Sequence, residues 1–354
     1  MNKVDLILDS GAYTAWKKQE TLKVEGYIDF INKHKDCLWE YVNLDVIPGA
    51  FGKKPSRDEV EASAAKGWEN LIKMRDAGLR AMPVFHMGER RYWLERMIGE
   101  GFDYIGISPA NDRTTKQKQA WLDEIFGFLC GDKGFPQIRT HGFGMTSLPL
   151  LYRYPWFSAD SVSWILFGAY GFVLIPFKKR DGVGYDYTTP PYTVHVSDRS
   201  SSETEEAPNS AAIDGAKMFD SVGPNMQKYI RNYLESEGFS LEVLRSSHAG
   251  RAQANCRFYR RISSSFELQP FLQHLQGGRG IFDHTEVSSL GSSTNLFGPL
   301  RLVFTTGSLD GEANLLNEEG IRERLISYYH IRDQKDLDLE HYVRYGFIPK
   351  RTKK

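Results

Sequence analysis

The chain has few cysteines and no excess of charge of either sign. Only three cysteines occur among 354 residues, and Cys37, Cys130 and Cys256 are far apart in sequence. This pattern excludes a disulfide framework and a Cys-x-x-Cys zinc motif, and it fits a reducing compartment. The 45 basic and 45 acidic residues balance, so any binding of nucleic acid must come from local basic patches.

Long hydrophobic runs are also missing. The most apolar stretch, residues 164–177, is too short and too interrupted by glycine to span a bilayer. The chain starts directly with a predicted strand, so we expect no signal peptide, no membrane partner and a cytoplasmic location. With 41% hydrophobic and 25% charged residues, the composition is that of a globular protein.

The first half of the chain alternates predicted strands and helices. Strands are predicted at residues 4–8, 41–44, 81–85, 104–107, 137–140 and 157–159. Helices are predicted at residues 24–35, from a capping box at Ser56–Glu59 to Gly78, at 92–98, at 116–129, and from Thr146 or Ser147 to 151. This alternation predicts parallel βαβ units, in a closed barrel or an open doubly wound sheet.

The rhythm changes after residue 161. Residues 172–177 and 192–196 are apolar and prone to form strands, which either finish a barrel or form a hairpin on it. Residues 198–209 and 288–295 are predicted loops, and the chain from residue 218 onward is predicted to be mainly helical, most clearly at 227–236. We therefore expect two regions, 1–200 and 201–354.

Short polar motifs follow the predicted strands. They are Asp9-Ser10-Gly11-Ala12-Tyr13, Asn43-Leu44-Asp45, His86-Met87-Gly88-Glu89, Ile105-Gly106-Ile107-Ser108, His141-Gly142-Phe143-Gly144 and Ser158-Ala159-Asp160-Ser161. Barrel enzymes collect such strand-end residues around one pocket, so functional residues after successive strands favour the barrel. The three carboxylates Asp9, Asp45 and Asp160 suggest chemistry on a polar substrate.

At these motifs the sequence resembles the tRNA-guanine transglycosylase superfamily, and most closely its phage-type branch, the 7-deazaguanine DNA transglycosylases. The resemblance implies a (β/α)8 TIM-like barrel, here with a mostly helical C-terminal extension. Such enzymes exchange guanine for a 7-deazaguanine base, such as preQ0, through a covalent enzyme–sugar intermediate. Two departures are the missing cysteine zinc site and the lack of a tRNA-binding signature in the C-terminal half.

The resemblance implies roles for individual residues. Asp160 matches the nucleophile, Asp9 the acid–base residue and Asp45 a second base-recognition residue. The motif with His86 matches loosely a turn that touches the base. The predicted substrate-binding residues are Ser10, Gly11, Tyr13, Asp45, His86, Gly106, His141, Gly142, Phe143 and Gly144.

Base exchange would require a different task of each of these residues. A carboxylate can trap an oxocarbenium-like sugar, and a second acid must protonate the leaving base. Asp9 suits the second task if burial and a neighbouring carboxylate raise its pKa. Asp45 would accept hydrogen bonds from the guanine edge, and the N–H of Gly106 could donate to O6. Tyr13 or Phe143 could stack on the base.

A base inside a duplex is unreachable, so the nucleic acid must be held in an opened form. Candidate backbone-binding residues are Lys178, Lys179, Arg180, Arg245, Arg251, Arg257, Arg260 and Arg261, with lysines at 350–354 as a further patch. DNA is the expected partner and tRNA the alternative, and no metal or other cofactor is expected. A non-catalytic nucleic-acid-binding barrel and a barrel hydrolase acting on a small nucleoside are the remaining rivals.

Overall fold

A computed structural model describes residues 6–110, 113–131, 134–145, 147–198, 216–265, 269–271 and 300–304. The described residues form a mixed α/β fold that includes a parallel sheet of five strands, β3, β4, β5, β6 and β12. The chain divides into two compact units. The first unit holds the described residues up to Gly144 together with Phe271, and the second holds those between Met145 and Pro270 together with 300–304.

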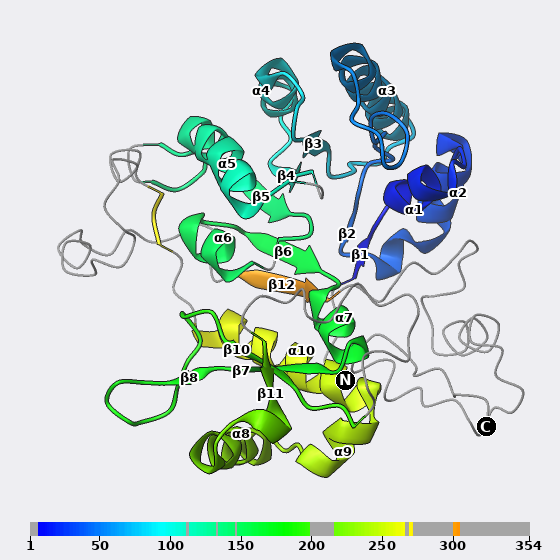
Figure 1. The fold of residues 1–354 in the computed structure, drawn as a ribbon. Helices are drawn as coiled ribbons and strands as arrows, with labels where there is room; N and C mark the ends of the chain where they lie inside the picture. Colours follow the sequence, from blue (N-terminus) through cyan, green and yellow to red (C-terminus); the bar gives the residue numbers. More distant parts are fainter. Residues whose placement is uncertain are drawn as a thin grey trace, which may run out of the picture. The chain divides into compact units, whose positions relative to one another are not determined.

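The first unit alternates strands and helices along the chain (Figure 1). Its strands are β1 (Ile7–Leu8), β2 (Glu40–Tyr41), β3 (Val84–His86), β4 (Tyr104–Ser108) and β5 (Arg139–Gly142). Its helices are α1 (Ala12–Lys18), α2 (Val24–His34), the 3-10 helix η1 (Lys35–Cys37), α3 (Arg57–Asp76), α4 (Arg91–Gly99) and α5 (Thr115–Leu129). This order confirms the predicted alternation, with element ends displaced by a few residues.

All pairings among the strands of the first unit that the structure describes are parallel. Ile7 pairs with Glu40 in β1 and β2, and a parallel bridge joins Val42 to Met82 just before β3. Strand β4 then pairs with β3 and with β5. Because parallel strands present their carboxyl ends at one edge, the residues that follow β1, β2 and β3 come together there.

Local sequence signals explain where the helices start. The hydroxyl of Ser56 accepts the backbone N–H of Glu59, and the carboxylate of Glu59 accepts the N–H of Ser56, so the predicted capping box is confirmed at the start of α3. A second box, between Thr114 and Gln117, starts α5. The predicted cap at Ser147 makes no side-chain hydrogen bond to its helix, and Thr146 lies outside the described residues.

The second unit contains two further groups of strands. Its strands are β6 (Ser158–Ser161), β7 (Phe172–Ile175), β8 (Phe177–Lys178), β9 (Tyr185–Asp186), β10 (Tyr192–His195), β11 (Lys217–Met218) and β12 (Arg301–Phe304). Its helices are α6 (Leu148–Arg153), α7 (Ser163–Ala169), the 3-10 helix η4 (Phe219–Ser221), α8 (Pro224–Ser236), α9 (Leu241–Ser246) and α10 (His248–Ser265). Strands β7 and β10 pair antiparallel in a sheet of their own with β11, so these segments pair as in the hairpin alternative.

Helix α10 forms the centre of the second unit. It crosses α7 so closely that a Cβ on Gly168 would lie 2.6 Å from the backbone nitrogen of Ala252. The buried Asn255 side chain accepts the N–H of Leu174 and donates to the carbonyls of Trp164 and Phe172. All polar atoms of this amide are therefore paired, and they tie α10 to α7 and β7.

The predicted fold class is confirmed at the level of α/β architecture. Helices α8, α9 and α10 agree with the helical character predicted after residue 218, as far as the described residues reach. A closed ring of eight strands is not seen among the described residues, and the barrel stays a prediction. The predicted boundary near residue 200, the loop at 288–295 and the lysines at 350–354 lie outside the described residues. No described helix is both long and apolar enough to cross a membrane.

Candidate active site

The carboxyl ends of β1, β2 and β3 bring three predicted site residues into direct contact. The hydroxyl of Ser10 donates to Oδ1 of Asp45 over 3.0 Å, and Nε2 of His86 lies 2.9 Å from Oδ2 of the same carboxylate. Ser10 is buried, and the side chains of Asp45 and His86 are each 11% exposed. Segments 35 and 41 positions apart in sequence thus meet at Asp45.

Glu89 completes this cluster, although it was not among the predicted site residues. Its Oε1 lies 3.0 Å from Nδ1 of His86, and its Oε2 accepts the backbone N–H of His86. A turn closed by the Glu89 N–H to the His86 carbonyl makes both contacts possible, with Gly88 at a positive φ of 107°. The motif His86-Met87-Gly88-Glu89 was recognised, and its internal spacing is the signal that could have identified Glu89.

The histidine between these carboxylates is an imidazolium. Desolvation on burial disfavours its charge, but hydrogen bonds to Asp45 and Glu89 and the charges of both carboxylates raise the pKa of His86 to about 10. Both ring nitrogens then act as donors, one to each carboxylate. His86 therefore holds the carboxylate of Asp45 in a fixed position and offsets part of its charge.

Asp9 directly precedes Ser10 and has the perturbed acidity predicted from the sequence. Enclosure by protein, the largest cause, and the negative charge of Asp45 together raise its pKa to about 6, against the lowering effect of the N–H groups of Ser10 and Gly11. The residue is nevertheless exposed to solvent. An accessible carboxyl group with a pKa near neutrality can both give and take a proton at physiological pH.

Helix α3 supports the segment that carries Asp45. Asn70 donates through Nδ2 to the carbonyl of Leu44, and Asn43 donates through Nδ2 to the carbonyl of Gly67. A Cβ on Gly67 would lie 3.7 Å from Cα of Asp45, which shows how closely the helix approaches. These contacts fix the backbone on which the carboxylate of Asp45 is presented.

Gly106 has a different role from the predicted one. Its N–H donates to the carbonyl of Pro83 in the ladder between β3 and β4, so it is not available to a base oxygen. This corrects the predicted contact to O6. A Cβ at Gly106 would lie 2.4 Å from Cε2 of Phe143, so the glycine is needed to let this ring lie against the strand.

The other predicted substrate-binding residues of the first unit differ in exposure. His141 is buried with its ring near Phe143, and burial lowers its pKa to about 3, so it is neutral. Tyr13 is 45% exposed on α1. Gly11 and Gly144 adopt positive φ values of 75° and 63°, at the start of α1 and just after β5. Gly142 is buried at the end of β5.

Asp160, the predicted nucleophile, lies in the second unit. It is half-buried within β6 rather than after it, opposite Val303 of β12, and its carbonyl accepts the N–H of Met145. Its meeting with Asp9 around one sugar stays a prediction, because each unit is described by itself.

The predicted basic patch on α9 and α10 is divided between the interior and the surface. Arg251 is 5% exposed, and its guanidinium donates to the carbonyls of Gly168, Leu244 and Arg245. This interior position corrects the predicted role of Arg251 in binding nucleic acid. The helix sequence lacks acidic residues, but the fold supplies them from elsewhere.

Acidic partners reach three of the remaining arginines. Arg245 makes two hydrogen bonds to Asp220, and Arg261 binds both carboxylate oxygens of Glu237. Arg257 lies 4.0 Å from the same Glu237. The predicted residues that are exposed are Arg260 and Arg261 on α10 and Lys178, Lys179 and Arg180 around the turn between β8 and β9.

Within the described ranges, no group of three or more histidine, cysteine, aspartate or glutamate side chains is arranged to hold a metal ion. No protein-family model, no curated protein and no solved structure matches the chain.

Proposed function

We propose that this protein is a transglycosylase that exchanges guanine in DNA for a 7-deazaguanine base such as preQ0. The observation that carries the proposal is the contrast between two neighbouring carboxylates. Asp9 is accessible with a pKa near 6, whereas Asp45 is held by Ser10 and the imidazolium of His86. One group is suited to proton transfer and the other to reading a polar base edge.

Asp45 would read the guanine edge. Each oxygen of a carboxylate can accept two hydrogen bonds, and among the described residues Ser10 donates one to Oδ1 and His86 donates one to Oδ2. Each oxygen thus retains one acceptor direction, which matches the N1–H and exocyclic N–H of a guanine or 7-deazaguanine. Adenine offers no N1–H and would leave a buried carboxylate unsatisfied, which is the basis of selection.

The proposed reaction uses Asp160 and Asp9 in two steps. An oxygen of Asp160 bonds to C1′ of the deoxyribose while the bond from C1′ to the guanine nitrogen breaks, and Asp9 gives its proton to the departing guanine. Asp9 then takes the proton from the incoming base, whose nitrogen bonds to C1′ and displaces Asp160. Two displacements give net retention. The proposal includes closure of the parallel strands into a (β/α)8 barrel, which would bring Asp160 to the edge that carries Asp9.

The test is incubation with labelled guanine, or with preQ0, and either DNA or tRNA, followed by mass spectrometry of the nucleosides. We expect incorporation into DNA and a covalent protein–DNA adduct that is absent in Asp160→Ala. Asp9→Asn should abolish exchange. Asp103→Asn is the matched control, because this exposed carboxylate precedes β4, at the opposite end of the strands. Exchange only in tRNA would overturn the choice of substrate, and absence of any exchange or adduct would overturn the proposal.

A further inference from the structure

Aromatic and basic side chains form an exposed surface on the segments that follow β1 and β2. Tyr13 and Phe51 are 45% and 46% exposed, and the ring of each contacts the ring of Trp16, at centroid distances of 5.8 Å and 5.2 Å. The ammonium group of Lys17 lies 5.7 Å from the ring centre of Phe51. Together with the exposed Lys53, we call these five residues the aromatic–lysine surface.

The loop after β2 is built to display Phe51. The N–H of Lys53 donates to the carbonyl of Ala50, and Gly52 adopts a positive φ of 76°, so Phe51 lies at the tip of a tight turn. The indole N–H of Trp16 donates to the carbonyl of Gly49 over 2.6 Å, which fastens this loop to α1. Phe51 thus contacts Trp16 while almost half of its surface stays exposed at the tip of the turn.

The surface starts next to the acid–base cluster. Tyr13 is four residues after Asp9, and Phe51 is six residues after Asp45. The hydrogen bond from Ser10 to Asp45 joins the two segments at the cluster, and the bond from Trp16 to Gly49 joins them again further out. A polymer bound on the surface would thus lead directly to Asp9 and Asp45.

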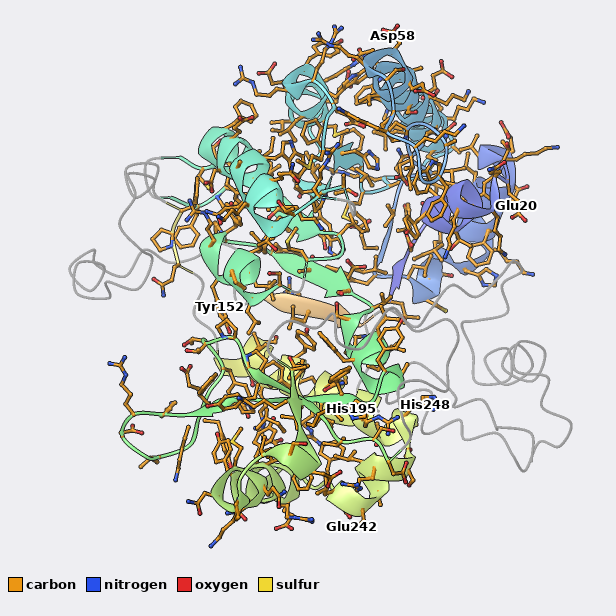
Figure 2. All side chains as sticks on the ribbon, in the orientation of Figure 1. Glu20, Asp58, Tyr152, His195, Glu242 and His248 are labelled. Carbon is orange, nitrogen blue, oxygen red and sulfur yellow. The ribbon has the colours of Figure 1, made fainter. Side chains whose placement is uncertain are left out.

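Charge and ring exposure together favour nucleic acid as the occupant. Lysine is depleted in the centres of protein–protein interfaces, whereas single-stranded nucleic acids are bound by aromatic faces that stack on bases and by cations that follow the phosphates. Figure 2 shows two acidic side chains of the same region, Glu20 and Asp58, apart from one another at the periphery of the unit.

We propose that the aromatic–lysine surface binds an unpaired stretch of DNA beside the nucleotide whose base is exchanged. This inference deepens the proposed function, on which it rests for the identity of the strand. Phe51 would stack on a base next to the target, and Lys17 and Lys53 would contact phosphates. The surface would thereby offset part of the cost of holding the strand open.

The test is fluorescence anisotropy of a labelled single-stranded oligodeoxynucleotide titrated with the full chain. We expect Phe51→Ala to weaken binding by a factor of about 5 to 150, the effect of losing one stacked base. We expect the double variant Lys17→Gln, Lys53→Gln to reduce the slope of log K against log salt by about 1.4, since each phosphate contact on a single strand contributes about 0.7.

Phe128→Ala is the matched control. Phe128 is 39% exposed on α5, and the guanidinium of Arg91 lies 5.3 Å from its ring centre, so it resembles Phe51 in exposure and in having a cationic neighbour. Its variant should bind DNA like the unchanged protein. Equal affinities for Phe51→Ala and Phe128→Ala, or no binding of single strands by the unchanged protein, would overturn the inference.

Parallel base-exchange assays separate the two proposals. If the unchanged protein binds single strands through Phe51 but exchanges no base, the surface is supported and the transglycosylase fails. If exchange proceeds and Phe51→Ala leaves both the affinity and the KM for DNA unchanged, the transglycosylase is supported and the surface fails.

Discussion

Replacing His86 by glutamine should remove a pH-dependent part of the protein's stability. The histidine lies between Asp45 and Glu89, and the side chains of the three residues are at most 11% exposed. The variant leaves two buried carboxylates without a cation, which typically costs about 3–5 kcal/mol. The more specific consequence concerns how stability changes with pH.

The expected slope follows from the raised pKa. The pKa of His86 is 6.5 for the free side chain and about 10 in the folded protein. A raised pKa adds stability that is complete below the unfolded value and is lost as pH rises toward the folded value. Stability should therefore fall by about 1.4 kcal/mol for each pH unit within this window, or about 2 kcal/mol between about pH 7 and about pH 8.5.

Urea unfolding followed by tryptophan fluorescence measures this slope. Two of the seven tryptophans, Trp68 and Trp93, line a small cavity together with His86 and Glu89, so part of the signal comes from the region of the cluster. Burial raises the pKa values of the Cys130 and Cys256 thiols to about 12. Unfolding exposes these thiols, which then lose their protons at high pH and make stability depend on pH as well. The upper limit of about pH 8.5 keeps this second contribution small. The difference between variant and unchanged protein cancels what remains of it.

The matched control is His141→Gln. This histidine is also buried, but its pKa is lowered to about 3, so it is neutral in both states above about pH 7.5. The control should lose stability without changing the slope. The same slope in His86→Gln as in the unchanged protein, or no slope in the unchanged protein, would refute the ion-paired cluster.

Three further predictions test individual contacts. Asp45→Asn should lower the pKa of Asp9, because the charge of Asp45 raises that pKa. The alkaline limb of the single-turnover pH–rate profile should then move to lower pH. An unmoved limb would exclude the coupling between the two carboxylates. Gly106→Ala should lower the free energy of unfolding in urea by about 1–3 kcal/mol through overpacking. Adding Phe143→Ala should recover part of this loss, since the new Cβ meets the Phe143 ring. A double variant whose loss equals the sum of the two single losses would contradict this contact. Arg251→Met should cost about 2–4 kcal/mol of stability by leaving carbonyls unpaired, while the salt dependence of DNA binding stays unchanged. Arg260→Gln should leave thermal stability unchanged. A changed salt slope in Arg251→Met would show that this residue does belong to the binding surface.

Local signals explain why much of the first unit could be predicted. The capping box at Ser56 and Glu59 specifies its helix through contacts three residues apart, and the structure has both hydrogen bonds. Apolar runs that end in Asp9 or His86 mark strand ends in the same way, through residues that are close together in sequence. The predicted rise in the pKa of Asp9 came from burial and a neighbouring carboxylate, and the parallel order of the strands supplies the second of these causes by bringing Asp45 near.

Long-range pairings explain what could not be predicted. Strand β12 pairs Arg301 with Ser158, and its short sequence gives no sign of a partner so far away. The arginines of α9 and α10 appeared unopposed because their partners Asp220 and Glu237 lie outside these two helices. The sequence does not reveal which carbonyl accepts the N–H of Gly106, so this group seemed available. In the structure it donates to the carbonyl of Pro83, just before β3.

The two carboxylates at the first strand ends differ because only one of them touches His86. The imidazolium stabilises the charge of Asp45 and is itself fixed by Glu89, whereas Asp9 has backbone N–H groups and the repulsion of Asp45. Burial and this repulsion raise the pKa of Asp9 to about 6, so Asp9 can exchange a proton near neutrality. The proposed base exchange would need this asymmetry, because a carboxylate that reads N–H groups must keep its charge while the neighbouring acid gains and loses a proton in every cycle.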